Sequence, residues 1–283
     1  MIVALKSSHD LEDLLQISKV ARSTFYYHAG KLDTPDKHTE LKIVIQKLFE
    51  NSQRRYGHRR IWLKLRALGW QVTKKLVHKL MNRLGLRSKA RVKRKYNSYK
   101  GTHSSIAPNI MARQFVAAGP NLKWVSDVTE FRVADKKVYL SPVMDLFDHS
   151  IVGYQSGTSP NIELTSASLH EAFTNQKPAA GVLVHTDQGF QYQHAKWREL
   201  IQRHEGVQSM SRKANCYDNA VIENFFGHLK SEMFHGESFK SASALMEAID
   251  SYILWWNTER VQEKLKGMTP IQYRRHALQL EPV

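Results

Sequence analysis

The sequence predicts an α/β protein, with a mixed sheet covered by helices, a helical region before it and a helical tail after it. Residues 123–157 are rich in β-branched and aromatic residues and contain two turn signals, at 135–137 and 148–150, which fits three antiparallel strands. From residue 162 on, helix-like and strand-like segments alternate. Before residue 87, apolar residues recur with the helical period.

The first 35 residues form a small helical segment in this prediction. Residues 10–30 contain two short apolar patterns, which predict two helices in the manner of a small helix-turn-helix unit. The second of these helices runs from Lys19 or Ser23 to His28, and Gly30 ends it. A longer helix is expected across residues 38–53.

Residues 36–86 are predicted to be a helix-turn-helix DNA-binding domain. A first helix around Ile61–Leu68 ends at Gly69, Thr73 caps a second, and Gly85 ends that one. An ordinary helical hairpin with charged outer faces is the alternative. The second helix carries four cations on its polar side, and these are candidate DNA contacts: Lys74, Lys75, Lys79 and Arg83.

Charge favours the DNA interpretation. The net charge is +16, and the 76 residues between Glu50 and Asp127 contain 19 Lys and Arg but no Asp or Glu. A segment of one sign repels itself unless an anion neutralises it, so it predicts a phosphate-binding surface rather than a merely solvated basic face or ribosomal-type adhesion. Residues 87–119 read as a basic linker. Further candidate DNA contacts are Arg59, Arg60, Arg91, Lys93, Arg94 and Lys95.

Composition also excludes several classes. No run of about 18 apolar residues exists, so no membrane span is expected. The N-terminal stretch MIVALKSSHDLEDLL is too short and too acidic for a signal peptide. A single cysteine, Cys216, excludes a disulfide framework and a cysteine-rich zinc site, and it fits a reducing compartment. We therefore expect a cytoplasmic, nucleoid-associated protein without zinc.

The catalytic core is expected to span residues 120–236, followed by a C-terminal helical extension, 237–283. After the three strands, the core elements alternate between helix and strand. Their expected ranges are 162–176, 181–189, 194–206, 207–211 and about 217–235, and the extension adds helices at 241–256 and from Thr269-Pro270.

Three carboxylates in this core are candidate catalytic residues and metal ligands. Asp127 lies in the first strand, and Asp187 ends a later strand just before a glycine turn, where ligands of α/β sheets gather. Taken singly, such an aspartate is usually a turn former. Glu223 lies on a helix beside an apolar stripe, and at 100° per residue it shares a face, about 60° wide, with Asn219 and Lys230.

Converging carboxylates repel one another unless a divalent cation neutralises them. Oxygen ligands suit Mg²⁺ or Mn²⁺, and two such ions about 4 Å apart serve phosphodiester transfer. Lys230 would then contact a phosphate near the metals. His185 and Asn219 are candidates to orient metal or substrate, with a local turn bond or cap as the alternative for each.

The motifs resemble a known family. NLKWVSDVTEF, VHTDQGFQY and NCYDNAVIENFFGHLKSE, together with YGHRRI and YILWWNTERVQEKLKGMTPIQYR, are similar to the second-reading-frame (OrfB) product of family-three insertion-sequence transposases. Asp127 and Asp187 are 60 residues apart, 35 residues separate Asp187 from Glu223, and Lys230 follows seven later. This matches the family's Asp–Asp–(35)–Glu pattern.

The resemblance implies an RNase H-like core with Asp127, Asp187 and Glu223 as the ligands of two Mg²⁺ ions. It implies 3′-end cleavage and strand transfer on DNA, with the element's terminal inverted repeats and a target as substrates. It further implies a homo-oligomer, at least a dimer when two ends are paired. The upstream-frame product is a candidate partner.

Three other functions are alternatives. A plain RNase H-like nuclease would share the carboxylates but needs no sequence-reading helices, and the acid-free segment argues against it. A DNA-binding regulator with an inactive core would lack one of the acids. A structural protein leaves the spacing of the acids unexplained.

Overall fold

The computed structural model describes most of the chain and divides it into two compact units, residues 1–47 and 48–283. Helix α4 (Thr39–Asn51) crosses the boundary between them. None of the helices in the described part of the chain has the length and apolar character needed to span a bilayer. The described ranges are 2–32, 36–89, 106–134, 136–212 and 216–280.

The first unit begins with α1 (Ile2–Leu5), α2 (Leu11–Ser18) and α3 (Arg22–Leu32). Asp10 caps α2 by accepting the N–H of Glu12 through Oδ1 at 2.7 Å. The two predicted short helices are therefore present. The prediction that Gly30 ends the second was wrong, because Gly30 does not take a positive φ and the helix continues past it.

The predicted helix pair of the DNA-binding region is confirmed as α5 (His58–Ala67) and α6 (Lys74–Arg83). Gly69, at φ 88°, ends the first helix in the left-handed conformation that glycine tolerates. Thr73 caps the second, because its Oγ1 accepts the N–H of Leu76 at 3.2 Å. A short turn of this kind between two packed helices is the helix-turn-helix outline.

The predicted mixed sheet is confirmed. Strand β3 (Lys136–Asp145) pairs antiparallel with β1 (Lys123–Ser126), β2 (Thr129–Val133) and β4 (Ile151–Gly157). Strand β5 (Leu183–Thr186) pairs parallel with both β1 and β6 (Val207–Met210).

The first predicted strand is split in two at Asp127. Strands β1 and β2 follow the same register on β3, with Ser126 opposite Val143 and Thr129 opposite Leu140. Extending this register by one residue places Asp127 opposite Pro142, which has no N–H to donate to the ladder. Four strands therefore replace the three predicted ones, and the break falls at the candidate catalytic aspartate.

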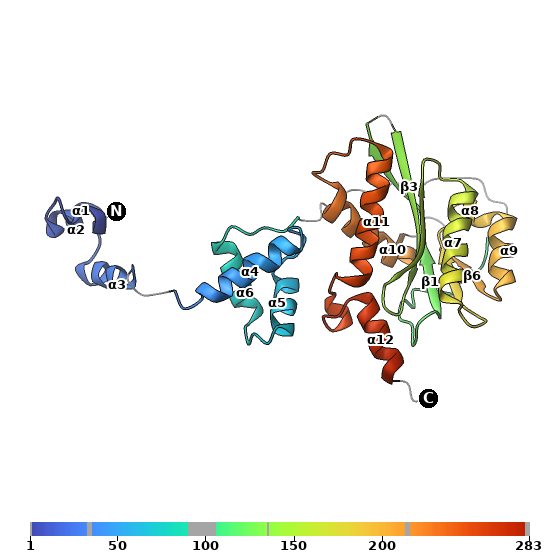
Figure 1. Cartoon of the computed structure of the whole chain (residues 1–283), viewed down its shortest axis with the longest axis horizontal. Coiled ribbons are helices and arrows are strands. Elements are labelled where there is room, and N and C mark those ends of the chain that lie inside the picture. Colours follow the sequence, from blue (N-terminus) through green and yellow to red (C-terminus); the bar gives the residue numbers. More distant parts are fainter. Residues whose placement is uncertain (1, 33–35, 90–105, 135, 213–215, 281–283) are drawn as a thin grey trace. The chain divides into compact units, whose positions relative to one another are not determined.

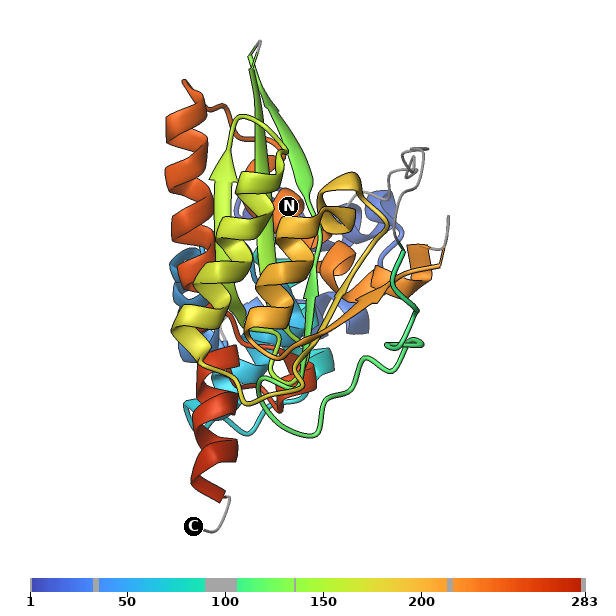
Figure 2. The same ribbon diagram turned by 90° about the vertical axis from the view of Figure 1, so that its right-hand side faces the viewer.

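Helices cover both faces of the sheet (Figure 1). Helices α7 (Ile162–Gln176), α8 (Phe190–Gln193) and α9 (Ala195–Arg203) pack on one face, and Figure 2 shows α7 and α9 side by side along the strands. Helices α10 (Ala220–Leu229) and α11 (Ala242–Thr258) pack on the other. Consecutive residues of β1 alternate between the layers: Trp124 joins the α7 side and Val125 the α10 side.

The C-terminal helices belong to the same packed structure. Helix α11 contributes five buried side chains to the core beneath α10, and α12 (Pro270–Leu280) is tied to the β3–β4 turn by Arg274, which ion-pairs with Asp145 at 2.6 Å and with Asp148. Burial beside Asp148 raises the pKa of Asp145 to about 6 in spite of this arginine. The domain boundaries at 35, 86, 119 and 236 stay predictions.

A π-helical segment, Lys230–Phe234, continues α10, and its Glu232 is almost fully buried. Arg260 binds both carboxylate oxygens, at 2.9 and 2.7 Å, and Arg60 of α5 and the hydroxyl of Tyr252 complete the cluster at 3.1 and 2.8 Å. Burial alone would raise the pKa of Glu232, but His228 and the two arginines hold it below its usual range. Removing one partner of a buried ion pair typically costs about 3–5 kcal/mol.

Gly153→Ala is expected to lower the free energy of unfolding by about 1–3 kcal/mol. A Cβ at Gly153 would lie 2.5 Å from the backbone N of Ala172 and O of Ser168, so α7 would have to move away from β4. Gly119→Ala is the matched control, because the nearest atom to its Cβ is 3.8 Å away. Urea unfolding of the two variants measures the difference, and equal midpoints would contradict the close approach.

Candidate active site

The two aspartates follow neighbouring parallel strands. Asp127 comes directly after β1 and Asp187 directly after β5, and Val125 pairs with His185 in the register that joins these strands. Each carboxylate is oriented by the next turn: Asp127 Oδ1 accepts the N–H of Val128 at 2.7 Å, and Asp187 Oδ1 accepts the N–H of Gly189 at 2.9 Å. Within the described residues, no hydrogen bond reaches the Oδ2 atom of either aspartate.

Helix α10 brings Glu223 to the same end of the sheet. Its apolar stripe, with Ile222 and Phe225 fully buried, packs against the sheet face that carries Val125. Asn219, just before the helix, donates from Nδ2 to the carbonyl of Ser126 at 3.3 Å. This bond joins the start of α10 to the residue that precedes Asp127.

Electrostatics place the carboxylates within range of one another. Burial raises the pKa of Asp127 well above its usual value, and the charges of Asp187 and Glu223 raise it further, while Lys230 opposes them. Burial also raises the pKa of Asp187. The three carboxylates do not form a preformed metal site, because among the described residues no three His, Cys, Asp or Glu are grouped closely enough to hold a metal ion.

Lys230 lies where α10 changes into the π-helical segment. Its Nζ is 5.2 Å from the centroid of the Phe131 ring, and it is half-buried. Both the aromatic ring and the nearby carboxylates attract its ammonium group. The predicted shared face of Glu223 and Lys230 thus brings both toward Asp127.

His185 lies in β5, two residues before Asp187, is fully buried, and hydrogen-bonds to β6 and the residue after it. Ser209 Oγ already accepts two N–H groups from residues 110–111, so its O–H donates to Nδ1 of the imidazole, 2.8 Å away. Ser211 donates to the carbonyl of Thr186 and therefore accepts from Nε2–H at 3.1 Å. Burial lowers the pKa of His185 to about 4, so the ring is neutral and orients the strand ends.

A buried aspartate holds the turn before α10. Asp218 accepts from Arg212 Nε at 2.9 Å, Arg113 Nε at 2.8 Å and Asn109 Nδ2 at 2.9 Å. The bonds from Arg212 and Arg113 hold the pKa of Asp218 well below its usual range. The network ties the segment before β1 to the 3₁₀ turn Cys216–Asn219, which carries Asn219.

Sequence reasoning missed two residues around the aspartates. Gly189 leaves little room for a side chain, because a Cβ there would lie 2.7 Å from Gln191 Nε2 and 3.0 Å from Asp187 Oδ1, so these two side chains would have to shift. The Tyr192 ring is fully buried, and burial together with Asp127 and Asp187 raises the pKa of its hydroxyl. The aspartate–glycine turn was a readable signal for Gly189, whereas no local pattern marks Tyr192.

The candidate DNA contacts fall into three groups. Arg59, Lys75, Lys79 and Arg83 are exposed on α5 and α6. Arg60 turns inward to Glu232, and Lys74 pairs with Glu263. Four of the candidates lie outside the described residues: Arg91, Lys93, Arg94 and Lys95.

Comparisons with known proteins agree with this arrangement. Two Integrase core domain families match residues 117–216 and 223–278, and an HTH-like domain family matches residues 36–95. The putative transposase InsK of insertion sequence IS150 from Escherichia coli K12 is 43% identical over 270 residues, which are 95% of each chain. The chain belongs to the IS3 family of insertion-sequence transposases.

Other relatives support the same assignment. Transposase InsF of IS3A, from the same organism, is 32% identical over 273 residues, again 95% of each chain. A chain of the simian T-cell lymphotropic virus intasome has a similar fold, with a TM-score of 0.50 and 17% identity over 84% of this transposase and 77% of that chain. The predicted RNase H-like core and helix-turn-helix region are confirmed. This transposase is a DNA-binding polynucleotidyl transferase.

The His185 imidazole is expected to stay neutral at pH 5.5. Its pKa is lowered from the usual 6.5 to about 4, so protonation begins only below about pH 5. Histidine ring NMR signals followed against pH measure this, and the signal missing from a His185→Gln spectrum identifies the ring. A titration midpoint near 6.5 would show that the buried hydrogen-bonded arrangement is absent in solution.

Proposed function

We propose that this chain cleaves the 3′ ends of an insertion sequence and joins them to new DNA through a single carboxylate site. Asp127, Asp187 and Glu223 are its catalytic residues, and His185 and Asn219 position them. The observation that carries the proposal is that Asp187 and Glu223, which come from separate elements, both add to the effect of burial in raising the pKa of Asp127 at one end of the sheet. Their spacing along the chain gives independent support.

The three acids fit divalent cations. They offer only oxygen ligands, and Asp127 is buried while Asp187 is half-buried. Burial raises the pKa of Asp127 most, and the charges of Asp187 and Glu223 add a repulsion that a cation would relieve. We propose that they hold two Mg²⁺ ions, with Mn²⁺ as the substitute, and no zinc. Ions held there supply Lewis-acid activation of the attacking oxygen and stabilise the leaving oxygen.

The chemistry needs no covalent protein intermediate. In cleavage, a water oxygen attacks a phosphorus and the bond to the 3′ oxygen breaks, which leaves a 3′-hydroxyl. In transfer, that hydroxyl attacks a second phosphodiester, so one phosphoester bond forms as another breaks. Lys230, beside Asp127, would hold a phosphate oxygen and balance its charge.

DNA recognition would use the second helix of the helix-turn-helix pair. Lys75, Lys79 and Arg83 are exposed on α6, whose N-terminal residues are those that reach bases in such domains. The terminal inverted repeats and a target DNA are the proposed substrates. The basic linker residues Arg91, Lys93, Arg94 and Lys95 are proposed to follow the phosphate backbone.

The proposed carboxylate site of one chain acts on one DNA end at a time, whereas two element ends have to be paired. We therefore propose at least a dimer on DNA, with the upstream-frame product as a further candidate partner. The proposed site of action is the bacterial cytoplasm at the nucleoid.

Asp127→Asn, Asp187→Asn and Glu223→Gln are each expected to reduce strand cleavage and joining by at least about 100-fold, because each removes a metal ligand. Labelled element-end DNA with Mg²⁺, resolved on denaturing gels, measures both steps, and DNA binding should persist. Glu130→Gln is the control, because Glu130 is a half-exposed carboxylate of β2 paired with Lys137. Activity retained by any one of the three would remove that residue from the mechanism.

The complex with end DNA is expected to contain at least two protein chains and two DNA ends. Multi-angle light scattering on the purified complex of the Glu223→Gln variant gives its mass without turnover. A mass that corresponds to one chain on one end, under conditions where wild type joins strands, would refute the dimer.

A further inference from the structure

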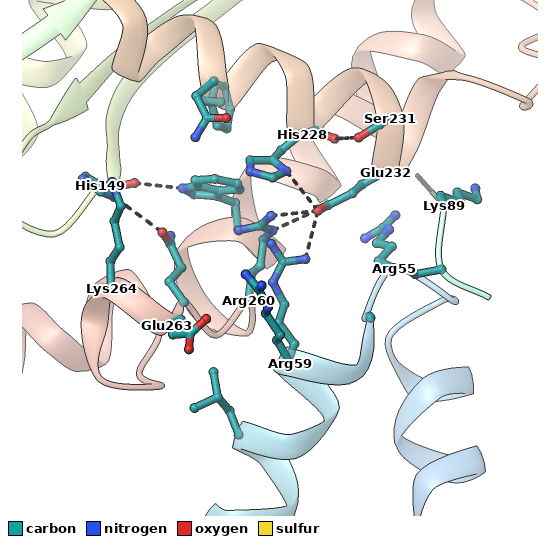
Figure 3. Close-up of a pocket in the computed structure, with 18 of the residues that line it drawn as sticks. Arg55, Arg59, Lys89, His149, His228, Ser231, Glu232, Arg260, Glu263 and Lys264 are labelled. Atoms are coloured by element: carbon teal, nitrogen blue, oxygen red, sulfur yellow. Dashed lines mark hydrogen bonds and ion pairs between the residues drawn. The ribbon is translucent and has the colours of Figure 1, made fainter. Parts of the chain in front are cut away.

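A cavity of about 730 Å³ lies on the other flank of the catalytic helix (Figure 3). Its walls are the start of α5, the flank of α10 with its π-helical continuation, and the loop after α11. At 100° per residue, Asn224 and His228 of this wall lie roughly 100–140° around α10 from Glu223. The cavity is therefore separate from the carboxylates.

The cavity is strongly cationic. Two carboxylates also line it, so six cations leave a formal excess of four positive charges. The lining histidines add no charge at neutral pH, because burial lowers the pKa of His58, His149 and His228. The six cations are Arg55, Arg59, Arg60, Lys89, Arg260 and Lys264.

Internal ion pairs account for only part of this charge. Glu232 forms ion pairs with Arg60 and Arg260. Lys89 forms an ion pair with Glu237, which does not line the cavity. The described part of the chain shows no ion pair for Arg59 or Lys264, which are both exposed. Figure 3 shows Lys264 and His149 on one side of the cavity and Arg55 and Lys89 on the other.

Among these cations, Arg55 gives the strongest indication of an external anion. Its guanidinium lies 4.7 Å from the centroid of the Trp255 ring and 5.4 Å from that of Tyr252, and it makes no ion pair within the described residues. Burial lowers its pKa, although Tyr252 and Glu232 act in the opposite direction. A partly desolvated guanidinium without a carboxylate partner favours an anion from outside the chain.

We propose that this cavity is a second DNA site, which holds phosphodiester groups of a strand on the flank of α10 opposite Glu223. The inference rests on the proposed function in taking DNA as the ligand. The volume lies within the range of about 300–1,000 Å³ common for ligand sites. The lining rings of Phe225 and Trp256 are buried and offer bases no platform on which to stack, whereas the exposed cations of the lining suit phosphate groups.

The arrangement gives α10 two functions. Glu223 and Lys230 face the reacting phosphate on one flank, and the cavity holds unreacting phosphates on the other. Because Arg55 and Arg59 come from the helix-turn-helix region, a strand seated here would connect end recognition to the catalytic helix.

The test compares Arg59→Gln/Lys264→Gln with Lys177→Gln/Arg203→Gln in the full chain. Both doubles remove two exposed positive charges, but Lys177 and Arg203 lie at the ends of α7 and α9, on the other sheet face. Binding of a fluorescent oligonucleotide is measured in EDTA across a salt series. The cavity double is expected to lose about tenfold in affinity and about two units of salt slope, equally on element-end and scrambled DNA.

Several results would overturn the inference. One is an equal loss of DNA affinity in the two double variants, and another is a loss confined to the element-end sequence. The third is a cavity double that binds tripolyphosphate more weakly but binds DNA as tightly as wild type. Recovery of affinity by Arg59→Lys/Lys264→Arg is expected, and failure to recover would also count against it. The proposed function is judged separately, since Glu223→Gln must bind DNA and fail to join it whatever the cavity does.

Discussion

The position of α10, the helix that carries the proposed catalytic residue Glu223, depends on one buried carboxylate, Glu232. It lies in the π-helical continuation of α10 and is neutralised by Arg260, whose guanidinium stacks 4.2 Å from the centroid of the Trp256 ring, and by Arg60 of α5. Such a charge is tolerated in the interior only when its hydrogen-bonding capacity is filled, and four side chains fill it here. Helix α5, far away in sequence, and α11 with the segment after it are thereby held against the helix that carries Glu223.

The end of the sheet with the proposed catalytic carboxylates shows the opposite electrostatic condition. Burial raises the pKa of Asp127, the charges of Asp187 and Glu223 raise it further, and Lys230 lowers it. Neutral groups hold this region in place: His185 bridges β5 and β6, and Asn219 joins α10 to the end of β1. The charge of Glu232 is neutralised by arginines, so the C-terminal continuation of α10 anchors the helix. The carboxylates near Asp127 are not neutralised in this way, so the start of α10 suits a cation.

Much of the fold could be predicted from local sequence patterns. Gly69, Thr73 and Gly85 predicted the ends of α5 and α6, because caps and left-handed positions have strong residue preferences. The stripe around Ile222 and Phe225 predicted which face of α10 packs on the sheet. The end of α3 was missed at Gly30, since a glycine need not stop a helix. The β1–β2 break was also missed, because it depends on Pro142 from another strand.

By itself, the sequence determined the identity of the carboxylates, their spacing, the helix-turn-helix and the excess of positive charge. These are properties of residue type and short-range periodicity. Only the tertiary structure decided which cations pair internally, as Arg60 does with Glu232 and Lys74 with Glu263. It also decided which cations line a cavity with no ion pair to any described residue, as Arg59 does. The reason is physical: the partner of a charge is set by desolvation and by contacts between residues as many as 189 positions apart, which no local pattern encodes.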